Sequence, residues 1–205
     1  MSNLFVADIH FGHQNCLAFD KRPFPDIKTH DEVIIGNWNN ACSPYDDVYL
    51  LGDISYHNVT KTIDILKQLP GKLHLIVGNH DNSFLRNRDF RNMFVEIDNY
   101  KELDIGGGAK AILSHYPIVA FNGQFRKNNV HLYGHVHCSS QWEMVERFKQ
   151  QTEKERGEGT CKAYNCGIMM DYMSYSPKTI EEIVGACDSR SIDDLIKCNK
   201  RPDNL

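Results

Sequence analysis

Short apolar runs alternate with amphipathic stretches along most of this chain. Strand-like apolar runs lie at residues 3–7, 48–51, 73–77, 109–113 and 130–133. Between the second and third runs, apolar side chains recur at helical spacing at Val59, Ile63, Leu66 and Leu69. This β-helix-β order predicts an α/β fold, and because no linker or repeat interrupts it, we expect residues 1–205 to form a single domain.

The remaining pattern predicts further helices and one hairpin. Thr29 and Glu32 have the spacing of a capping box and predict a helix at 29–41. The runs 95–105 and 109–113 flank three consecutive glycines and predict a β-hairpin. The charge-rich stretch 141–160 is helical at its start, and closing helices are expected at 179–187 and 191–199.

Five polar segments follow the apolar runs at the points where these strands end. They are Asp8-Ile9-His10, Gly52-Asp53, Gly78-Asn79-His80-Asp81, Ser114-His115 and Gly134-His135-Val136-His137. Because ligands gather at the carboxyl ends of strands in α/β sheets, we expect the five segments to meet at one edge. Their carboxylate, amide and imidazole groups suit a pair of divalent transition metals.

Composition narrows the possible binding partners and the cellular compartment. A formal net charge of -4 and a pI near 6.2 provide no overall basic field for nucleic acid or an anionic membrane. Seven cysteines without a CxxC pair favour a reduced, intracellular protein. The N-terminus lacks a signal-peptide pattern, and no apolar run approaches ~18 residues, so we expect a cytoplasmic protein without a membrane span.

The five segments, in this order, resemble the motifs of the calcineurin-like metallophosphoesterase family. Within that family the chain is most similar to the small bacterial and phage phosphoesterases, which share the segments His10-Phe11-Gly12-His13, Arg22-Pro23-Phe24 and Asn37-Trp38-Asn39. The resemblance implies an α/β (α+β) fold of four layers, αββα, in which two mixed β-sheets pack face to face and are flanked by helices.

The resemblance also implies two metal sites that share Asp53. The first metal would be held by Asp8, His10, Asp53 and His137, and the second by Asp53, Asn79, His115 and His135. Two divalent ions against two carboxylates leave a positive surplus of about two, which favours a phosphate group. Mn²⁺ is the expected metal, with Fe, Zn or Ni as alternatives, and a hydroxide bridging both ions would attack phosphorus in line.

Other polar residues are candidates for catalysis and substrate binding. By resemblance, His80 contacts the phosphate or protonates the leaving oxygen, and Asp81 orients its ring and favours its charged form. The candidates for substrate contact are His13, Arg22, Asn39 and His57, and the loop 121–129, with Phe125 and Arg126, is a candidate for substrate selection. Three other histidines, in contrast, are expected to be structural, namely His30, His74 and His131.

These residues predict a hydrolase of phosphoric mono- or diesters acting on a small phosphoester. Two other functions are considered. A nuclease would share the chemistry but would need a basic groove, and the scattered Lys and Arg residues do not indicate one. A metal-binding scaffold without turnover would be expected to have lost ligands, and none is missing here. The natural substrate and the oligomeric state are left open by the sequence.

Overall fold

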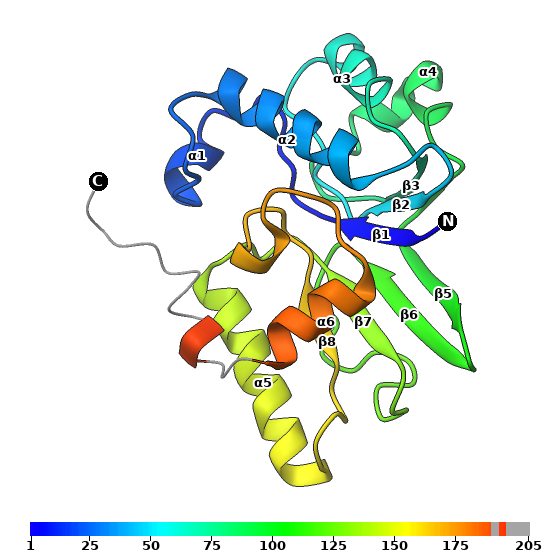
Figure 1. The fold of residues 1–205 in the computed structure, drawn as a ribbon, viewed down its shortest axis with the longest axis vertical. Helices are drawn as coiled ribbons and strands as arrows, with labels where there is room; N and C mark the ends of the chain where they lie inside the picture. The colour runs from blue at the N-terminus through cyan, green and yellow to red at the C-terminus, as the bar shows by residue number, and fades with distance from the viewer. Residues whose placement is uncertain (190–192, 196–205) are drawn as a thin grey trace.

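Two four-stranded sheets form the centre of the computed structural model, which describes residues 1–189 and 193–195 (Figure 1). The first sheet contains β1 (Asn3–Val6), β2 (Asp47–Leu50), β3 (Lys72–Ile76) and β4 (Glu96–Asp98), in that order. The second sheet contains β5 (Tyr100–Gly106), β6 (Ala109–Ser114), β7 (Val130–Tyr133) and β8 (Ala163–Asn165).

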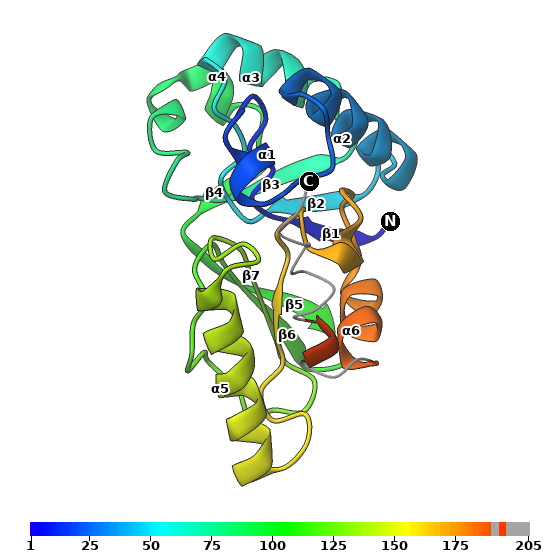
Figure 2. The same ribbon diagram turned by 90° about the vertical axis from the view of Figure 1, so that its left-hand side faces the viewer.

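Helices lie outside both sheets, as Figures 1 and 2 show. Those beside the first sheet are α1 (Cys16–Phe19), α2 (Ile27–Ala41), α3 (Val59–Leu66), η1 (Phe84–Arg86) and α4 (Arg88–Arg91). Those beside the second are α5 (Ser140–Arg156), η2 (Asp171–Met173) and α6 (Ile180–Asp188). The expected layered α/β architecture is confirmed. None of the helices in the described ranges is long and apolar enough to cross a membrane.

The strand directions refine the expectation of two mixed sheets. All pairs in the first sheet are parallel. In the second sheet β5 is antiparallel to β6, whereas the β6–β7 and β7–β8 pairs are parallel. The second sheet is therefore mixed, and the first is parallel through its four strands.

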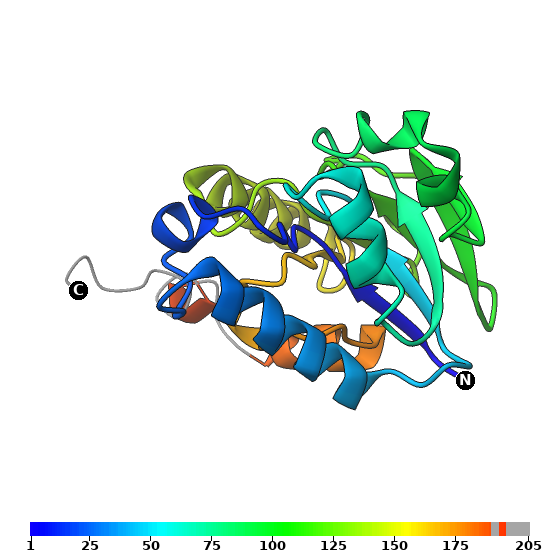
Figure 3. The same ribbon diagram turned by 90° about the horizontal axis from the view of Figure 1, so that it is seen from above.

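Side chains on opposite faces of β1 belong to two different apolar cores. Leu4 and Val6 pack in the cluster that includes Trp38 of α2, and Figure 3 shows α2 running alongside β1. Phe5 instead packs in the cluster that includes Leu113 of the second sheet. Because both faces are covered, the strand has a continuous apolar run rather than an alternating pattern.

Two details differ from the sequence prediction, and one predicted helix lies mostly outside the described residues. Helix α2 begins at Ile27, because the Asp26 carboxylate accepts a hydrogen bond from the N–H of Thr29 at 2.7 Å and caps the helix earlier than expected. The run 95–105 is divided between β4 of one sheet and β5 of the other, while the predicted β5–β6 hairpin is confirmed. Most of the helix predicted at 191–199 lies outside the described residues.

Candidate metal centre

The candidate ligands lie on loops that follow the carboxyl ends of the strands, and five of them have left-handed backbone conformations. Their φ angles are 53° for Asp8, 57° for His10, 57° for Asp53, 68° for His135 and 48° for His137. This conformation costs roughly 1–2 kcal/mol for a residue with a side chain. Such strain is concentrated at functional sites, where the surrounding structure fixes it.

Backbone pairing between the loops after β1 and β2 holds these conformations. The N–H of Asp8 donates to the carbonyl of Gly52 at 3.0 Å, and the N–H of His10 donates to the carbonyl of Asp53 at 3.1 Å. Gly52 is required at this crossing, because a Cβ atom there would lie 2.5 Å from Nδ1 of His115. The two carboxylate-bearing loops are therefore fixed side by side.

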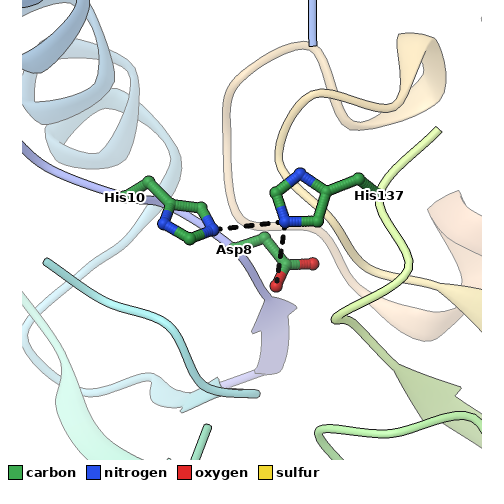
Figure 4. Close-up of side chains that lie close together, drawn as sticks. All are labelled: Asp8, His10 and His137. Atoms are coloured by element: carbon green, nitrogen blue, oxygen red, sulfur yellow. Dashed lines mark hydrogen bonds and ion pairs between the residues drawn. The ribbon is translucent and has the colours of Figure 1, made fainter. Parts of the chain in front are cut away.

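Asp8, His10 and His137 form the first group of candidate ligands (Figure 4). Nε2 of His137 lies 3.2 Å from Nε2 of His10 and 3.9 Å from Oδ1 of Asp8. The Nδ1–H of His137 donates to the Asp20 carboxylate at 2.8 Å, so in the neutral imidazole Nε2 carries the lone pair. That lone pair points into the group, where a metal ion would accept it.

Asp53, His115 and His135 form the second group, and their ligand atoms lie within 4.8 Å of one another. The Nδ1–H of His115 donates to the carbonyl of Leu51 at 2.7 Å, which leaves a lone pair on Nε2. This Nε2 lies 3.1 Å from Oδ1 of Asn79 and 3.6 Å from Oδ2 of Asp53. Three electron-pair donors thus face one another, namely Nε2 of His115, Oδ1 of Asn79 and Oδ2 of Asp53. A cation between them would bind all three.

Asp53, a member of the second group, also lies close to the first group. Its Oδ2 is 3.8 Å from Nε2 of His10 in the first group and 3.6 Å from Nε2 of His115 in the second. Its Oδ1 accepts the backbone N–H of His80 at 3.0 Å, which fixes the carboxylate. One side chain can therefore reach both candidate positions.

In the metal-free protein, burial disfavours the charged forms of several candidate ligand side chains. Burial raises the pKa of Asp8, although the nearby His137 and His115 act in the opposite direction. Burial also lowers the pKa of His10 and of His135. A bound cation favours a charged carboxylate and neutral imidazoles, so the donor set fits divalent metal ions.

His80 lies at the solvent side of the centre. Its side chain is 42% exposed, and Nε2 lies 3.9 Å from Oδ2 of Asp53. The hydroxyl group of Tyr56 lies 2.8 Å from Nδ1 of His80, which places a hydrogen-bond partner beside the imidazole. The ring of His80 is therefore accessible from solvent and lies beside Asp53.

Asp81 has a different arrangement from the one expected. Its buried carboxylate accepts three backbone N–H groups, from Asp53 at 2.9 Å, Gly78 at 2.8 Å and Ile54 at 3.0 Å. The described hydrogen bonds of the Asp81 carboxylate therefore all go to backbone N–H groups. The described hydrogen-bond partner of the His80 ring is the hydroxyl group of Tyr56. The expectation that Asp81 orients His80 is corrected, since Asp81 instead joins the loops after β2 and β3.

Two predicted substrate residues, His13 and His57, lie close to the centre. The ring of His13 is 5.2 Å from that of His10, and it stacks on Tyr56 at 3.6 Å with an interplanar angle of 9°. His57 is 28% exposed, and its Nε2 lies 2.9 Å from the Asp31 carboxylate. Of these two histidines, His13 is the one whose ring contacts a candidate ligand, His10.

Arg22 is buried beneath the centre and does not face solvent. Its guanidinium donates to the Asp20 carboxylate at 2.8 Å and to the carbonyls of Asp8 and Ile9 at 2.9 and 2.8 Å. The predicted phosphate contact is therefore corrected. Arg22 supports the backbone of the loop that carries Asp8.

Asn39 lies at the opposite end of the first sheet. It is exposed on α2, and the indole N–H of its neighbour Trp38 donates to the carbonyl of Pro70 at 3.0 Å, just before β3 begins. That is the amino end of the strand, whereas the ligands follow the carboxyl ends. The predicted substrate contact of Asn39 is corrected for this reason.

The loop 121–129 also lies away from the metal centre. Because β6 and β7 are parallel, this loop leads to the amino end of β7, whereas His135 follows its carboxyl end. Arg156 lies over the ring of Phe125 at 4.7 Å, at the far end of α5. A helix of this length extends about 24 Å. The far end of α5 is therefore remote from the ligand loops, and the predicted role of the loop 121–129 in substrate selection is corrected.

Several residues around the centre were missed by sequence reasoning. They are Asp20, which bonds His137, and three exposed aromatic residues that contact candidate ligands or their neighbours, namely Phe19, Tyr56 and Tyr116. No spacing signal connects Asp20 with His137, since 117 residues separate them. Their roles follow from the tertiary structure alone.

The layered fold is of the αββα class, and the two ligand groups are candidate metal sites. A model of the calcineurin-like phosphoesterase superfamily domain matches residues 1–180. The chain therefore belongs to the calcineurin-like phosphoesterase superfamily, and the family expected from the motifs is confirmed.

Similar proteins include relatives from an archaeon, a phage and a bacterium. An uncharacterized protein of Methanocaldococcus jannaschii is 25% identical over 93% of this chain and 96% of its own length. The Gene 66 protein of Mycobacterium phage L5 is 30% identical over 58% of this chain and 65% of its own length. A crystal structure of a protein of unknown function from Aquifex aeolicus has a TM-score of 0.58 at 25% identity, covering 90% of this chain and 98% of that one.

Proposed function

We propose that the chain is a metal-dependent phosphoric ester hydrolase with two divalent cations. The first cation would be held by Asp8, His10, Asp53 and His137, and the second by Asp53, Asn79, His115 and His135. The observation that supports this most directly is the position of Asp53, whose Oδ2 lies 3.6 and 3.8 Å from imidazole nitrogens of the two groups.

The charge of the centre favours a phosphate ester as substrate. Two divalent cations against the carboxylates of Asp8 and Asp53 leave about two positive charges, while the neutral ligands add none. When bound, such cations lower the pKa of a shared water and neutralise charge on phosphoryl oxygens. Mn²⁺ is our first candidate, and Fe, Zn and Ni are alternatives because imidazole and oxygen ligands accept each of them.

His80 is the proposed proton donor to the leaving oxygen. Its exposed ring lies beside Asp53, and the hydroxyl group of Tyr56 limits its rotation. Asp81 keeps His80 in position indirectly, because it fixes the backbone of the loop from Gly78 to Asp81. His13 supports the ring of Tyr56 by stacking on it.

Hydrolysis of bis(p-nitrophenyl) phosphate with each of the four metals tests the proposal. We expect turnover with Mn²⁺ and its loss in Asp53→Asn, because the amide removes the shared negative charge. Asp26→Asn is the matched control, since Asp26 is an exposed helix cap that Asn can replace. Absence of turnover with every metal would refute the hydrolase, and full activity in Asp53→Asn would refute the shared ligand.

A further inference from the structure

Two hollows open beside the metal centre, and each has an exposed aromatic ring in its wall. The first, here the Tyr56 hollow, has a volume of about 390 Å³ and is lined in part by Tyr56 and His80. The second, the Phe19 hollow, has a volume of about 330 Å³ and is lined in part by Phe19, His135 and His137. Both volumes lie in the range of sites for small organic ligands.

Both hollows adjoin the position at which a phosphate would react. The ring of His10 lies 5.9 Å from His80 of one hollow and 5.0 Å from His137 of the other. Among the residues that the structure describes, none lines both hollows. A monoester has one organic substituent and a diester has two, so a pair of separate hollows fits a diester.

The aromatic rings in the two walls are held by histidines of the centre while remaining exposed. Tyr56 is 41% exposed, and the stacked ring of His13 supports one of its faces at 3.6 Å. His13 does not line the Tyr56 hollow, so Tyr56 contributes other parts of its ring to that wall. Phe19 is 54% exposed and packs edge-to-face on His137 at 5.5 Å. Fixed, exposed rings of this kind are stacking platforms for planar ligands.

The charges of the residues that line the two hollows indicate whether a long or a short substrate would bind. The described residues that line the two hollows include no Lys or Arg, and Asp20 is among those that line the Phe19 hollow. Proteins that follow a polynucleotide backbone use a cationic groove for it. The walls therefore suit a short ester rather than a long nucleic acid.

Building on the proposed hydrolase, we propose that its substrate is a small phosphodiester of the nucleoside class. The leaving alcohol carries a planar heterocycle that stacks on Tyr56, and the second substituent lies in the Phe19 hollow. Water forms the new phosphorus–oxygen bond as the bond to the leaving oxygen breaks. His80 donates a proton to that oxygen and regains one from the attacking water by way of solvent, giving an alcohol and a phosphomonoester.

Thymidylyl-thymidine and two abasic analogues test this substrate class. Each analogue lacks one of the two bases, so the reacting phosphodiester and its alcohols are otherwise unchanged. We expect kcat/KM to fall roughly 5- to 100-fold when the base of the leaving nucleoside is removed. Tyr56→Leu should abolish this preference, and Tyr56→Phe, which keeps the ring but loses the bond to His80, should retain it. Phe19→Leu should weaken only the preference for the other base.

Bis(p-nitrophenyl) phosphate in parallel assays separates the two proposals. If this diester is hydrolysed but the abasic analogues react as fast as the dinucleotide, the nucleoside inference is overturned and the hydrolase stands. If the diester is not hydrolysed with any metal, the hydrolase fails and the inference fails with it. A salt-sensitive rise in kcat/KM as the substrate grows to about ten nucleotides would overturn the small-substrate inference in favour of a nuclease.

Discussion

The Nδ1–H of His137 donates to the carboxylate of Asp20 at 2.8 Å, and this bond fixes which nitrogen of His137 faces the first metal position. Partners of this kind keep the ligand in the correct tautomer, and their loss typically weakens metal affinity 10- to 100-fold. Asp20 also bonds Arg22, so it connects the ligand to the support beneath the Asp8 loop.

Replacement of Asp20 should therefore weaken one metal site and spare the other. In Asp20→Ala we expect the affinity for Mn²⁺ at the first site to fall roughly 10- to 100-fold, with a smaller loss in Asp20→Asn. Calorimetric titration of Mn²⁺ resolves the two sites, and Asp26→Asn is the matched control. Because removal of Asp20 leaves Arg22 buried without its carboxylate partner, unfolding in EDTA must first establish that each variant is folded. Two sites of unchanged affinity in Asp20→Ala would contradict the assignment.

The left-handed conformation of His135 predicts a stability cost that a glycine would relieve. Alanine at φ 68° keeps the strain, whereas glycine accepts this conformation freely. In the metal-free protein we expect His135→Gly to be more stable than His135→Ala by about 0.5–1 kcal/mol, after the entropy cost of glycine is included. Urea unfolding of both variants in EDTA measures the difference. A more stable alanine variant would show that the backbone at this ligand is not strained.

The close approach at Gly52 predicts a severe effect from one added methyl group. A Cβ atom at this position would lie 2.5 Å from Nδ1 of His115 and 2.6 Å from Cα of Gly78. Gly52→Ala should therefore displace His115 and abolish metal binding at the second site. Gly36→Ala is the control, because nothing lies within 4 Å of its Cβ position in α2, and it should stabilise the protein by up to about 1 kcal/mol. Retention of both metal sites in Gly52→Ala, measured by titration, would contradict the packing argument.

The strands and candidate ligands were accessible from sequence because both depend on local signals. Apolar runs buried on two faces mark β1, β2 and β3, and the polar segments follow directly where these strands end. This local order of apolar run and polar segment is sufficient to predict that the five segments meet at one edge. The structure brings their side chains together at the expected edge, around Asp53.

The errors arose where an interaction depends on distant parts of the chain. Arg22 could be recognised as a cation near the ligands, but its burial against Asp20 and two carbonyls follows from tertiary packing. The loop 121–129 was misplaced because its position depends on the direction of β7, which the apolar pattern does not encode. Asp81 was assigned to His80 by resemblance to the family's motif, whereas folding places it against the backbone of Asp53 and Ile54.

His131 predicts a pH dependence of stability that is separate from the metal centre. Its buried ring donates from Nδ1 to the carbonyl of Ile112 at 2.9 Å, while Nε2 accepts the N–H of Ile118 at 2.9 Å. Protonation would place a second hydrogen opposite the N–H of Ile118. Burial lowers the pKa of His131 to about 4, although the hydrogen bonds to the backbone of Ile112 and Tyr116 act in the opposite direction.

The sign of this effect follows from proton binding to the unfolded chain. Between pH ~6.5 and ~4 the unfolded state takes up a proton at His131 that the folded state does not, so the stability falls as the pH is lowered through this window. The full loss from this group is about 3 kcal/mol. His131→Gln, which cannot titrate, should show a correspondingly smaller decrease in the free energy of unfolding. Urea unfolding in EDTA across this range measures both proteins, and parallel pH profiles would show that His131 accepts a proton in the folded state.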